Sequence, residues 1–261
     1  GIGCSYTDKN FKSSDKTLHE DKKGGWPMWP ELMANELNLD CINLGLCATG
    51  TDSMFNDFVS AISEFGDKID TIAILLSGSD RCIHYQALDL LPIINFAGIP
   101  TSDDLYGEVQ NSIDFFNKCT YVKSSYKRMI QNHFIKILAM IELCRYHKIK
   151  FIMKQGVTLF PHWPFDNLKK SHNAYIDKNQ IGKFVVECKS FQVIDRSDSI
   201  HNIIGWPLYA PLGGNSYDDA ILNNEKLKKM HCISDNDGHP NASGQILIAK
   251  DFIERHKELY P

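Results

Sequence analysis

Short apolar runs alternate with longer amphipathic segments along the whole chain. The apolar runs are rich in Ile, Val, Leu or Phe, as is typical of strands that are buried on both faces of a sheet. Strands are therefore predicted at 1–3, 40–46, 71–77, 150–154 and 191–194. The alternation predicts an α/β fold in which helices cover both faces of a parallel sheet of about five strands.

The segments between these runs carry apolar residues at helical spacing. Helices are predicted at 29–39, 52–65, 125–147 and 242–259. The clearest is 125–147, in which one face of the helix carries Ile130, Phe134, Ile137, Leu138 and Ile141.

Two stretches, 82–124 and 198–236, fit no alternating unit. Loops of this length in a compact domain are usually functional or disordered. We interpret them as insertions at the carboxyl ends of the strands, where open α/β sheets place their sites. The chain has no internal repeat and no linker-like tract, so residues 1–261 are predicted to form one domain.

Charge and hydropathy exclude two classes of partner. The formal net charge is −4, and lysines cluster only as isolated pairs. Nucleic-acid binding normally needs a concentrated basic face, so no such partner is expected. No apolar run reaches the ~18 residues of a membrane-spanning helix, so no membrane span is predicted. The oligomeric state stays open.

Eight cysteines are scattered singly through the chain, with no C-x-x-C pair. This pattern favours reduced, mostly buried thiols in a cytoplasm-like compartment, although an even number leaves disulfides open. The chain starts at Gly1, inside a predicted strand. We therefore expect a truncated N-terminus, from which any targeting segment is missing.

The first candidate for chemistry is a serine directly after the first strand. Ser5 follows Gly3 by two residues and precedes Thr7 by two. A serine where a strand turns sharply has an exposed hydroxyl and backbone N–H groups that point outward, which suits a nucleophile. The same pattern also occurs in ordinary turns, so it is not specific alone.

The second candidate lies near the other end of the chain. His239 is preceded by Asp235 and Asp237 and is followed by Pro240 and a predicted helix. A serine hydroxyl needs a base such as histidine, and the imidazole needs a carboxylate that fixes its tautomer. Asp237 or Asn241 could equally serve as caps for the helix.

Together, the two segments resemble the SGNH (GDSL-type) serine hydrolase superfamily over essentially the whole chain. In that family the nucleophile lies in a G-x-S motif after the first strand. Its N-x-G-x-x-G run is similar to 43–50, its G-x-N-D run to 77–80, and its D-x-x-H-P run to 237–240. The resemblance implies a three-layer α/β/α sandwich of the flavodoxin-like kind, with Ser5 as nucleophile and His239 as base.

The resemblance also implies an oxyanion hole, with departures from the family pattern. The backbone donors are expected to be the N–H groups of Ser5 and of Ala48 or Gly50, since Ala48 stands where the family has a glycine. A backbone donor tolerates that exchange if the turn keeps φ negative.

The family's side-chain donor, Asn, is replaced by Ser79. A hydroxyl can donate one hydrogen bond but is shorter than an amide, and loss of an oxyanion donor costs about 10²–10³ in turnover. Arg81 is the alternative stabiliser, and Ser77 is a further candidate for oxyanion or substrate contact. The S-x-x-D-R run at 77–81 also looks like a variant seen in hydrolase-like proteins of phages and marine microbes.

The acid is displaced as well. Asn236 stands three residues before the histidine, where the family has Asp. Asp237 matches the D-x-H spacing of the alginate O-acetyltransferase branch and is the preferred partner, with Asp235 in reserve.

The expected function is hydrolysis of small acyl esters, such as acetyl groups on carbohydrate, without a cofactor. Histidines show no ligand spacing such as H-E-x-x-H, so no metal is expected. Trp163 and Trp206 could stack on a glycan or simply pin their loops. Two rivals remain: an O-acyltransferase with the same site, and an inactive module that binds glycans.

Overall fold

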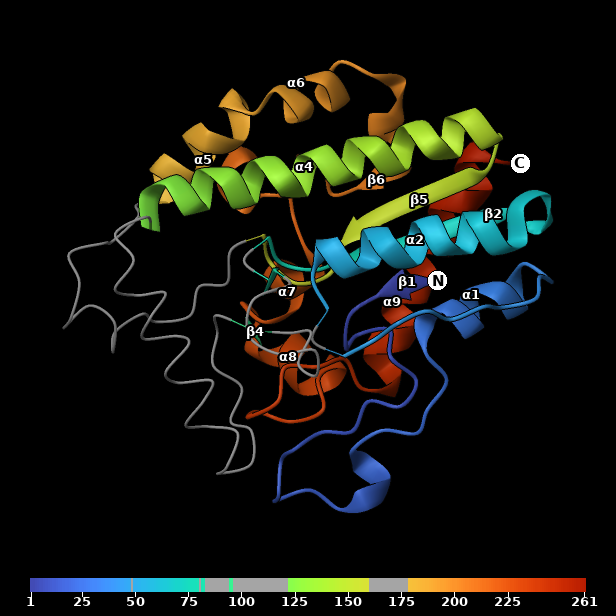
Figure 1. Cartoon of the computed structure of the whole chain (residues 1–261). Coiled ribbons are helices and arrows are strands. Elements are labelled where there is room, and N and C mark those ends of the chain that lie inside the picture. The colour runs from blue at the N-terminus through green and yellow to red at the C-terminus, as the bar shows by residue number, and fades with distance from the viewer. Residues whose placement is uncertain (48, 80, 83–93, 96–121, 160–177) are drawn as a thin grey trace.

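A four-stranded parallel sheet forms the centre of the protein (Figure 1). The computed structural model describes residues 1–47, 49–79, 81–82, 94–95, 122–159 and 178–261. The strands follow the order β1-β2-β5-β6 and are β1 (Ile2–Gly3), β2 (Thr71–Leu76), β5 (Lys150–Gln155) and β6 (Ile203–Ile204). The central pair, β2 and β5, is in register from Thr71 with Lys150 to Leu76 with Gln155. A separate antiparallel pair joins β3 (Arg81–Cys82) to β4 (Ile94–Asn95).

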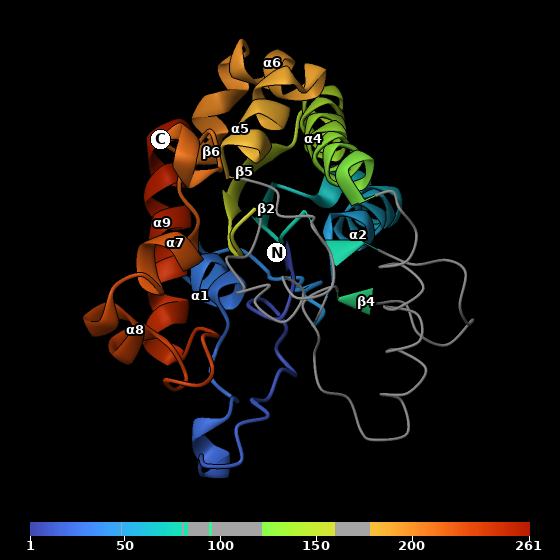
Figure 2. The ribbon, with the colours of Figure 1, turned by 90° about the vertical axis from the view of Figure 1, so that its left-hand side faces the viewer.

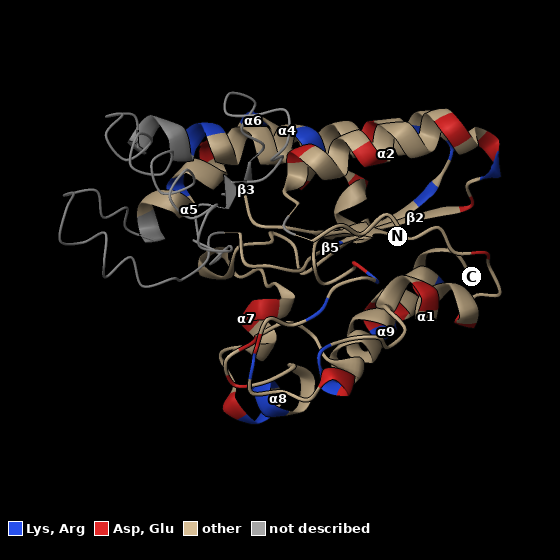
Figure 3. Ribbon diagram, turned by 60° about the horizontal axis from the view of Figure 1, so that its bottom comes forward, with Lys and Arg blue, Asp and Glu red and all other residues tan. Residues whose placement is uncertain are grey.

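Helices cover both faces of the sheet, as Figures 2 and 3 show. One face carries α2 (Thr51–Phe65), α4 (Val122–His147), α5 (Lys178–Glu187) and α6 (Lys189–Asp195). The other side carries α1 (Trp29–Glu36), α7 (Tyr217–Ile221), α8 (Glu225–His231) and α9 (Ala242–Leu259). Short 3-10 turns are η1 (Glu20–Lys22), η2 (Gly66–Lys68), η3 (Asp198–Asn202) and η4 (Ala210–Leu212). The α/β class with a parallel sheet is therefore confirmed.

The core packs between these layers. Five of the six residues of β2 are buried, because helices cover the strand on both faces. On one side Met54 and Phe58 of α2, one helical turn apart, are fully buried. On the other, the rings of Trp29 and Phe252 stack at 4.4 Å and join α1 to α9. An ion pair between Lys154 of β5 and the half-buried Asp251 of α9 joins the sheet to that helix.

The four predicted helices are all present, with ends shifted by a few residues. The strand predicted at 191–194 is wrong, because these residues lie in α6. Phe191 and Ile194 are both buried, three residues apart on one helical face, and the Phe191 ring meets Phe134 of α4 at 5.2 Å. An apolar run of four fits a strand and a buried helix equally well. The actual edge strand is β6.

Residues 40–46 are not assigned as a strand, yet they run beside β1. The N–H groups of Leu44 and Leu46 donate to the carbonyls of Gly1 and Gly3 at 2.8 and 3.1 Å, and the Gly1 amino group donates to the Ile42 carbonyl at 2.7 Å. The segment is therefore extended and hydrogen-bonded to the edge of the sheet, but its hydrogen bonds do not form a regular β-ladder.

The predicted insertions have different outcomes. The stretch 198–236, predicted to be an insertion, contains η3, β6, η4, α7 and α8, and β6 belongs to the central sheet. Within it, the Trp206 indole stacks on Phe191 at 4.8 Å and donates to Asp195 at 2.8 Å, which pins its loop. Most of 82–124, and Trp163, lie outside the described residues.

Two further expectations can be compared with the described residues. None of the helices there is long and apolar enough to cross a membrane. The side chains of six cysteines are described; none of the six forms a disulfide, and four are buried.

Candidate active site

Ser5 lies in a tight turn at the carboxyl end of β1. The N–H of Thr7 donates to the carbonyl of Cys4 at 2.8 Å and closes the turn. Gly3 has no room for a side chain, because Thr7 packs against its Cα. The Thr7 hydroxyl in turn accepts from the Trp29 indole N–H at 3.0 Å, which ties the turn to α1. The glycine and threonine of the motif therefore fix the position of Ser5.

His239 lies in a short loop that leads into α9. The loop is closed by a bridge between Cys232 and Pro240, and the Ile233 N–H donates to the His239 carbonyl at 2.9 Å. Asn241 caps the helix, since its side chain accepts from the N–H of Gly244 at 3.0 Å. The capping role that the sequence left open thus belongs to Asn241.

The structure brings Ser5, His239 and Asp237 together in one hydrogen-bonded chain. The His239 Nε2 lies 2.9 Å from Ser5 Oγ, and its Nδ1 lies 2.5 Å from Asp237 Oδ1. The same carboxylate oxygen accepts from the backbone N–H of His239 at 3.0 Å. With the proton on Nδ1 directed at Asp237, Nε2 is free to accept the proton of the serine.

Asp235, the reserve acid, has a different environment. It is exposed, and its backbone carbonyl accepts from Lys228 Nζ at 2.9 Å. No hydrogen bond joins its carboxylate to the imidazole in the described part of the structure. Asp237 is therefore the acid of this arrangement.

Asp237 is held from both sides. Burial favours its neutral form, but the hydrogen bond and charge of His239, and a hydrogen bond from Ser13, outweigh burial and lower the pKa of the carboxyl from 3.8 to about 2. The Ser13 hydroxyl donates to Oδ2, the oxygen that does not face the imidazole. The carboxylate is therefore ionised and oriented at neutral pH.

A second serine–aspartate contact lies beside the first. The Ser234 hydroxyl donates to Asp15 Oδ2 at 2.7 Å and also accepts from the Asp237 N–H at 3.1 Å. Two reciprocal contacts thus join the segment after the nucleophile to the loop that carries the acid. No sequence pattern pointed to Ser13 or Asp15, because the partners lie more than 200 positions apart.

Two aromatic rings hold the imidazole of His239. Phe11 stacks on it, with ring centroids 4.2 Å apart, and Tyr6 meets it edge-on at 5.3 Å. The Tyr6 hydroxyl donates to the buried Asp218 at 2.6 Å, which fixes the ring of Tyr6. The imidazole is therefore restrained in the orientation that its two hydrogen bonds require.

The backbone groups expected at the oxyanion hole are partly in place. The N–H of Ser5 has no hydrogen-bond partner among the described residues. Gly50 is buried and precedes the first turn of α2, whose N–H groups carry partial positive charge. The preceding residue, Thr49, donates to the Gly3 carbonyl at 3.3 Å, so this helix end lies beside the nucleophile turn. Ala48 lies outside the described residues.

The side-chain donors differ from expectation. Both the hydroxyl and the N–H of Ser79 donate to the Leu159 carbonyl, at 2.8 and 3.0 Å, so the hydroxyl is already engaged. The Ser77 hydroxyl is fully buried and has no partner in the described part of the chain. The side chain of Arg81 lies outside the described residues. Of these serines, Ser77 has the uncommitted donor.

A buried histidine contacts the N-terminal end of α2. His133 of α4 shares a hydrogen bond of 2.8 Å between its Nδ1 and the hydroxyl of Thr51, the first residue of α2. Burial lowers the pKa of His133 to about 4, so its ring is neutral at pH 7. This contact fixes the helix end that lies beside Ser5.

Comparison with known proteins adds no assignment. The sequence matches no known protein family, and no curated protein is significantly similar to it. Across the described residues, no three His, Cys, Asp or Glu side chains form a cluster that could hold a metal ion.

Proposed function

We propose that this protein is a serine ester hydrolase of the SGNH type, in which Ser5 is the nucleophile, His239 the base and Asp237 the orienting acid. The observation that carries the proposal is the continuous chain of hydrogen bonds from Ser5 Oγ through the imidazole to Asp237, at 2.9 and 2.5 Å. Residues 234 positions apart meet there with the geometry of a nucleophile, a base and its orienting group.

The reaction follows from that geometry. Nε2 of His239 takes the proton of Ser5 as Oγ attacks the ester carbonyl carbon, and the carbonyl electrons move onto the oxygen. When the tetrahedral species collapses, the C–O bond to the alcohol breaks, and His239 passes its proton to the departing oxygen. Water then attacks the acyl-enzyme by the same steps in reverse and releases the acid and Ser5. No cofactor takes part.

The oxyanion requires donors that are already oriented. In this proposal the N–H groups of Ser5 and of Gly50 or Ala48 supply the backbone donors. Ser79 can contribute only by leaving the Leu159 carbonyl, so Ser77 or Arg81 is the remaining side-chain candidate.

The proposal also extends the observed α/β fold to a specific topology with a fifth strand. The three layers form a flavodoxin-like sandwich, and residues 42–46, bonded to the outer edge of β1, supply the fifth strand. This order places β1 inside the sheet and the nucleophile turn at its carboxyl edge, where open parallel sheets place their sites.

A serine-reactive fluorophosphonate probe tests the proposal. We expect the wild-type protein to be labelled and to hydrolyse p-nitrophenyl acetate, and we expect Ser5→Ala to do neither. Ser63→Ala, at an exposed position on α2, is the control and should be labelled like the wild type. Absence of labelling in the wild type would favour a binding module. Product analysis with a sugar acceptor present separates hydrolysis from acyl transfer.

Ser13→Ala is expected to lower kcat about tenfold with little change in KM, because one hydrogen bond to the charged Asp237 is lost. Steady-state kinetics measure this effect, and Ser13→Thr should restore most of it. The matched control is Ser197→Ala, which removes a half-buried hydroxyl that donates to Ile194 at 2.9 Å, far from the site. Equal losses in both variants would show that Ser13 has no special role.

A further inference from the structure

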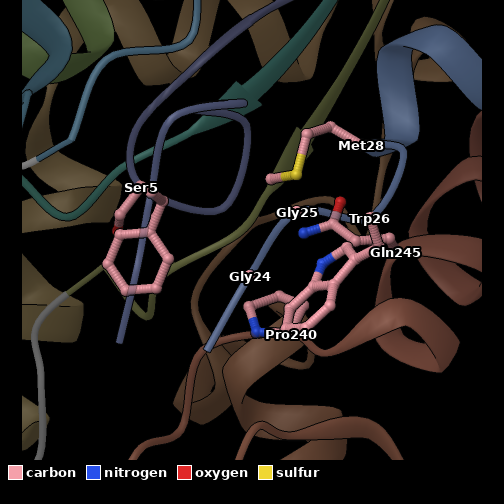
Figure 4. A pocket seen from close by; sticks show the side chains of 8 residues that line it. Ser5, Gly24, Gly25, Trp26, Met28, Pro240 and Gln245 are labelled. Carbon is pink, nitrogen blue, oxygen red and sulfur yellow. The ribbon is translucent and has the colours of Figure 1, made fainter. Parts of the chain in front are cut away.

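A small cavity opens directly beside the nucleophile. Its walls include Ser5, Phe11, Trp26, Met28, Pro240 and Gln245. Figure 4 shows Trp26, Met28, Pro240 and Gln245 gathered on the side of the cavity opposite Ser5. The walls thus come from the nucleophile turn, the segment that leads into α1, and the start of α9.

The cavity is small and secluded. Its volume is about 10 Å³, close to the least space that admits one water molecule, which is similar in size to a methyl group. Ser5 itself is only 3% exposed. A group that enters from the Ser5 side therefore has room for about one carbon atom beyond the reacting centre.

The walls of the cavity present both apolar and polar surface. Phe11, Trp26, Met28 and Pro240 present carbon and thioether surface. Besides Ser5, the walls carry the polar side chain of Gln245, which is engaged at both ends of its amide: it donates to the Tyr6 carbonyl at 3.1 Å and accepts from the Trp29 N–H at 3.0 Å. A small apolar substituent can therefore pack against the carbon and thioether surface, and the Gln245 amide is already bonded to the backbone of Tyr6 and Trp29.

The stereochemistry of attack decides which part of an ester occupies it. The carbon that is bonded to Ser5 Oγ carries three other groups: the oxyanion, the leaving oxygen and the acyl substituent. The leaving alcohol must face His239 for protonation and then return to solvent, so a secluded cavity of this size cannot hold it. The acyl substituent is therefore the part of the ester that fits the cavity.

We propose that this cavity is the acyl subsite, that it accepts the methyl group of acetyl esters, and that Trp26 sets the limit on acyl length. The inference rests on the proposed function and names its substrate class. Trp26 is the best candidate for the limit because it is half-buried and lies outside any helix or strand. Its removal therefore enlarges the subsite with little cost to the fold, whereas the buried Met28 packs at the start of α1.

Acyl-length profiles test the inference. We expect the wild type to prefer p-nitrophenyl acetate over the butyrate ester by about 100-fold in kcat/KM, because the extra carbons have no space. Trp26→Ala should reduce that preference about tenfold or more, mainly through faster butyrate hydrolysis, and Trp26→Phe should lie between. Tyr146→Ala, at an exposed aromatic on α4, is the matched control and should keep the wild-type profile.

The outcomes separate the two proposals. If the wild type hydrolyses acetate and is labelled at Ser5 but Trp26→Ala lowers acetate and butyrate rates equally, the subsite is wrong and the hydrolase stands. A wild type that prefers butyrate also overturns the subsite. If the wild type hydrolyses neither ester faster than Ser5→Ala and takes up no probe, the proposed function itself fails.

Discussion

His239→Ala is expected to lower kcat for ester hydrolysis about 10⁶-fold, which leaves only the background of the oxyanion donors and of substrate binding. Among the described residues, the Nε2 of His239 is the hydrogen-bond partner of Ser5 Oγ, so removal of the imidazole takes away the group that accepts the serine proton. Phosphonate labelling should disappear together with turnover, since both require the activated hydroxyl. Stopped assays at high enzyme concentration measure the residual rate.

His201→Ala is the matched control for this variant. His201 is exposed on η3, and its replacement should leave kcat unchanged. The thermal unfolding of both variants should resemble that of the wild type. A tenfold or smaller loss in His239→Ala, with the protein folded, would contradict the proposed role of the histidine.

Asp237→Asn is expected to lower kcat about 10⁴-fold. The amide keeps the shape of the carboxylate but can present its N–H₂ group to Nδ1, which favours the tautomer with the proton on Nε2. That tautomer cannot accept the proton of Ser5. Asp235→Asn provides a control two residues away and should retain wild-type turnover. If Asp235→Asn lost turnover and Asp237→Asn kept it, Asp235 would be the acid that orients His239.

The same substitution has a consequence for acid stability. Because the pKa of Asp237 is about 2 in the folded protein, against 3.8 for an unperturbed aspartate, ionised Asp237 stabilises the fold above about pH 4. That contribution decreases as the pH falls from about 4 to about 2. In urea titrations, the free energy of unfolding of the wild type relative to Asp237→Asn should therefore decrease over this range. A constant difference would show that the carboxyl has an ordinary pKa.

Motifs with strong local constraints could be predicted from the sequence. The turn at Ser5 needs Gly3 because Thr7 occupies the space of a side chain, and that requirement leaves a readable pattern. The loop before α9 likewise needs Asn241 as a cap and places His239 just before it. Both segments therefore carried enough signal to be paired across the chain.

The supporting contacts left no such pattern. Ser13 and Phe11 lie in an irregular segment, and their partners Asp237 and His239 lie at the far end of the chain, so no spacing links them. Likewise, the buried run 191–194 resembles a strand, because its helical partner Phe134 is remote in sequence. Local composition cannot supply information that resides in tertiary contacts.

The meeting of residues 5 and 239 also has a consequence during translation. Ser5 leaves the ribosome well before the imidazole that activates it, which is made more than two hundred residues later. In the proposed mechanism a nascent polypeptide carries an inert hydroxyl and cannot be acylated prematurely by cellular esters. On that mechanism, Ser5 becomes reactive only after α9 has been synthesised and has packed against the rest of the fold.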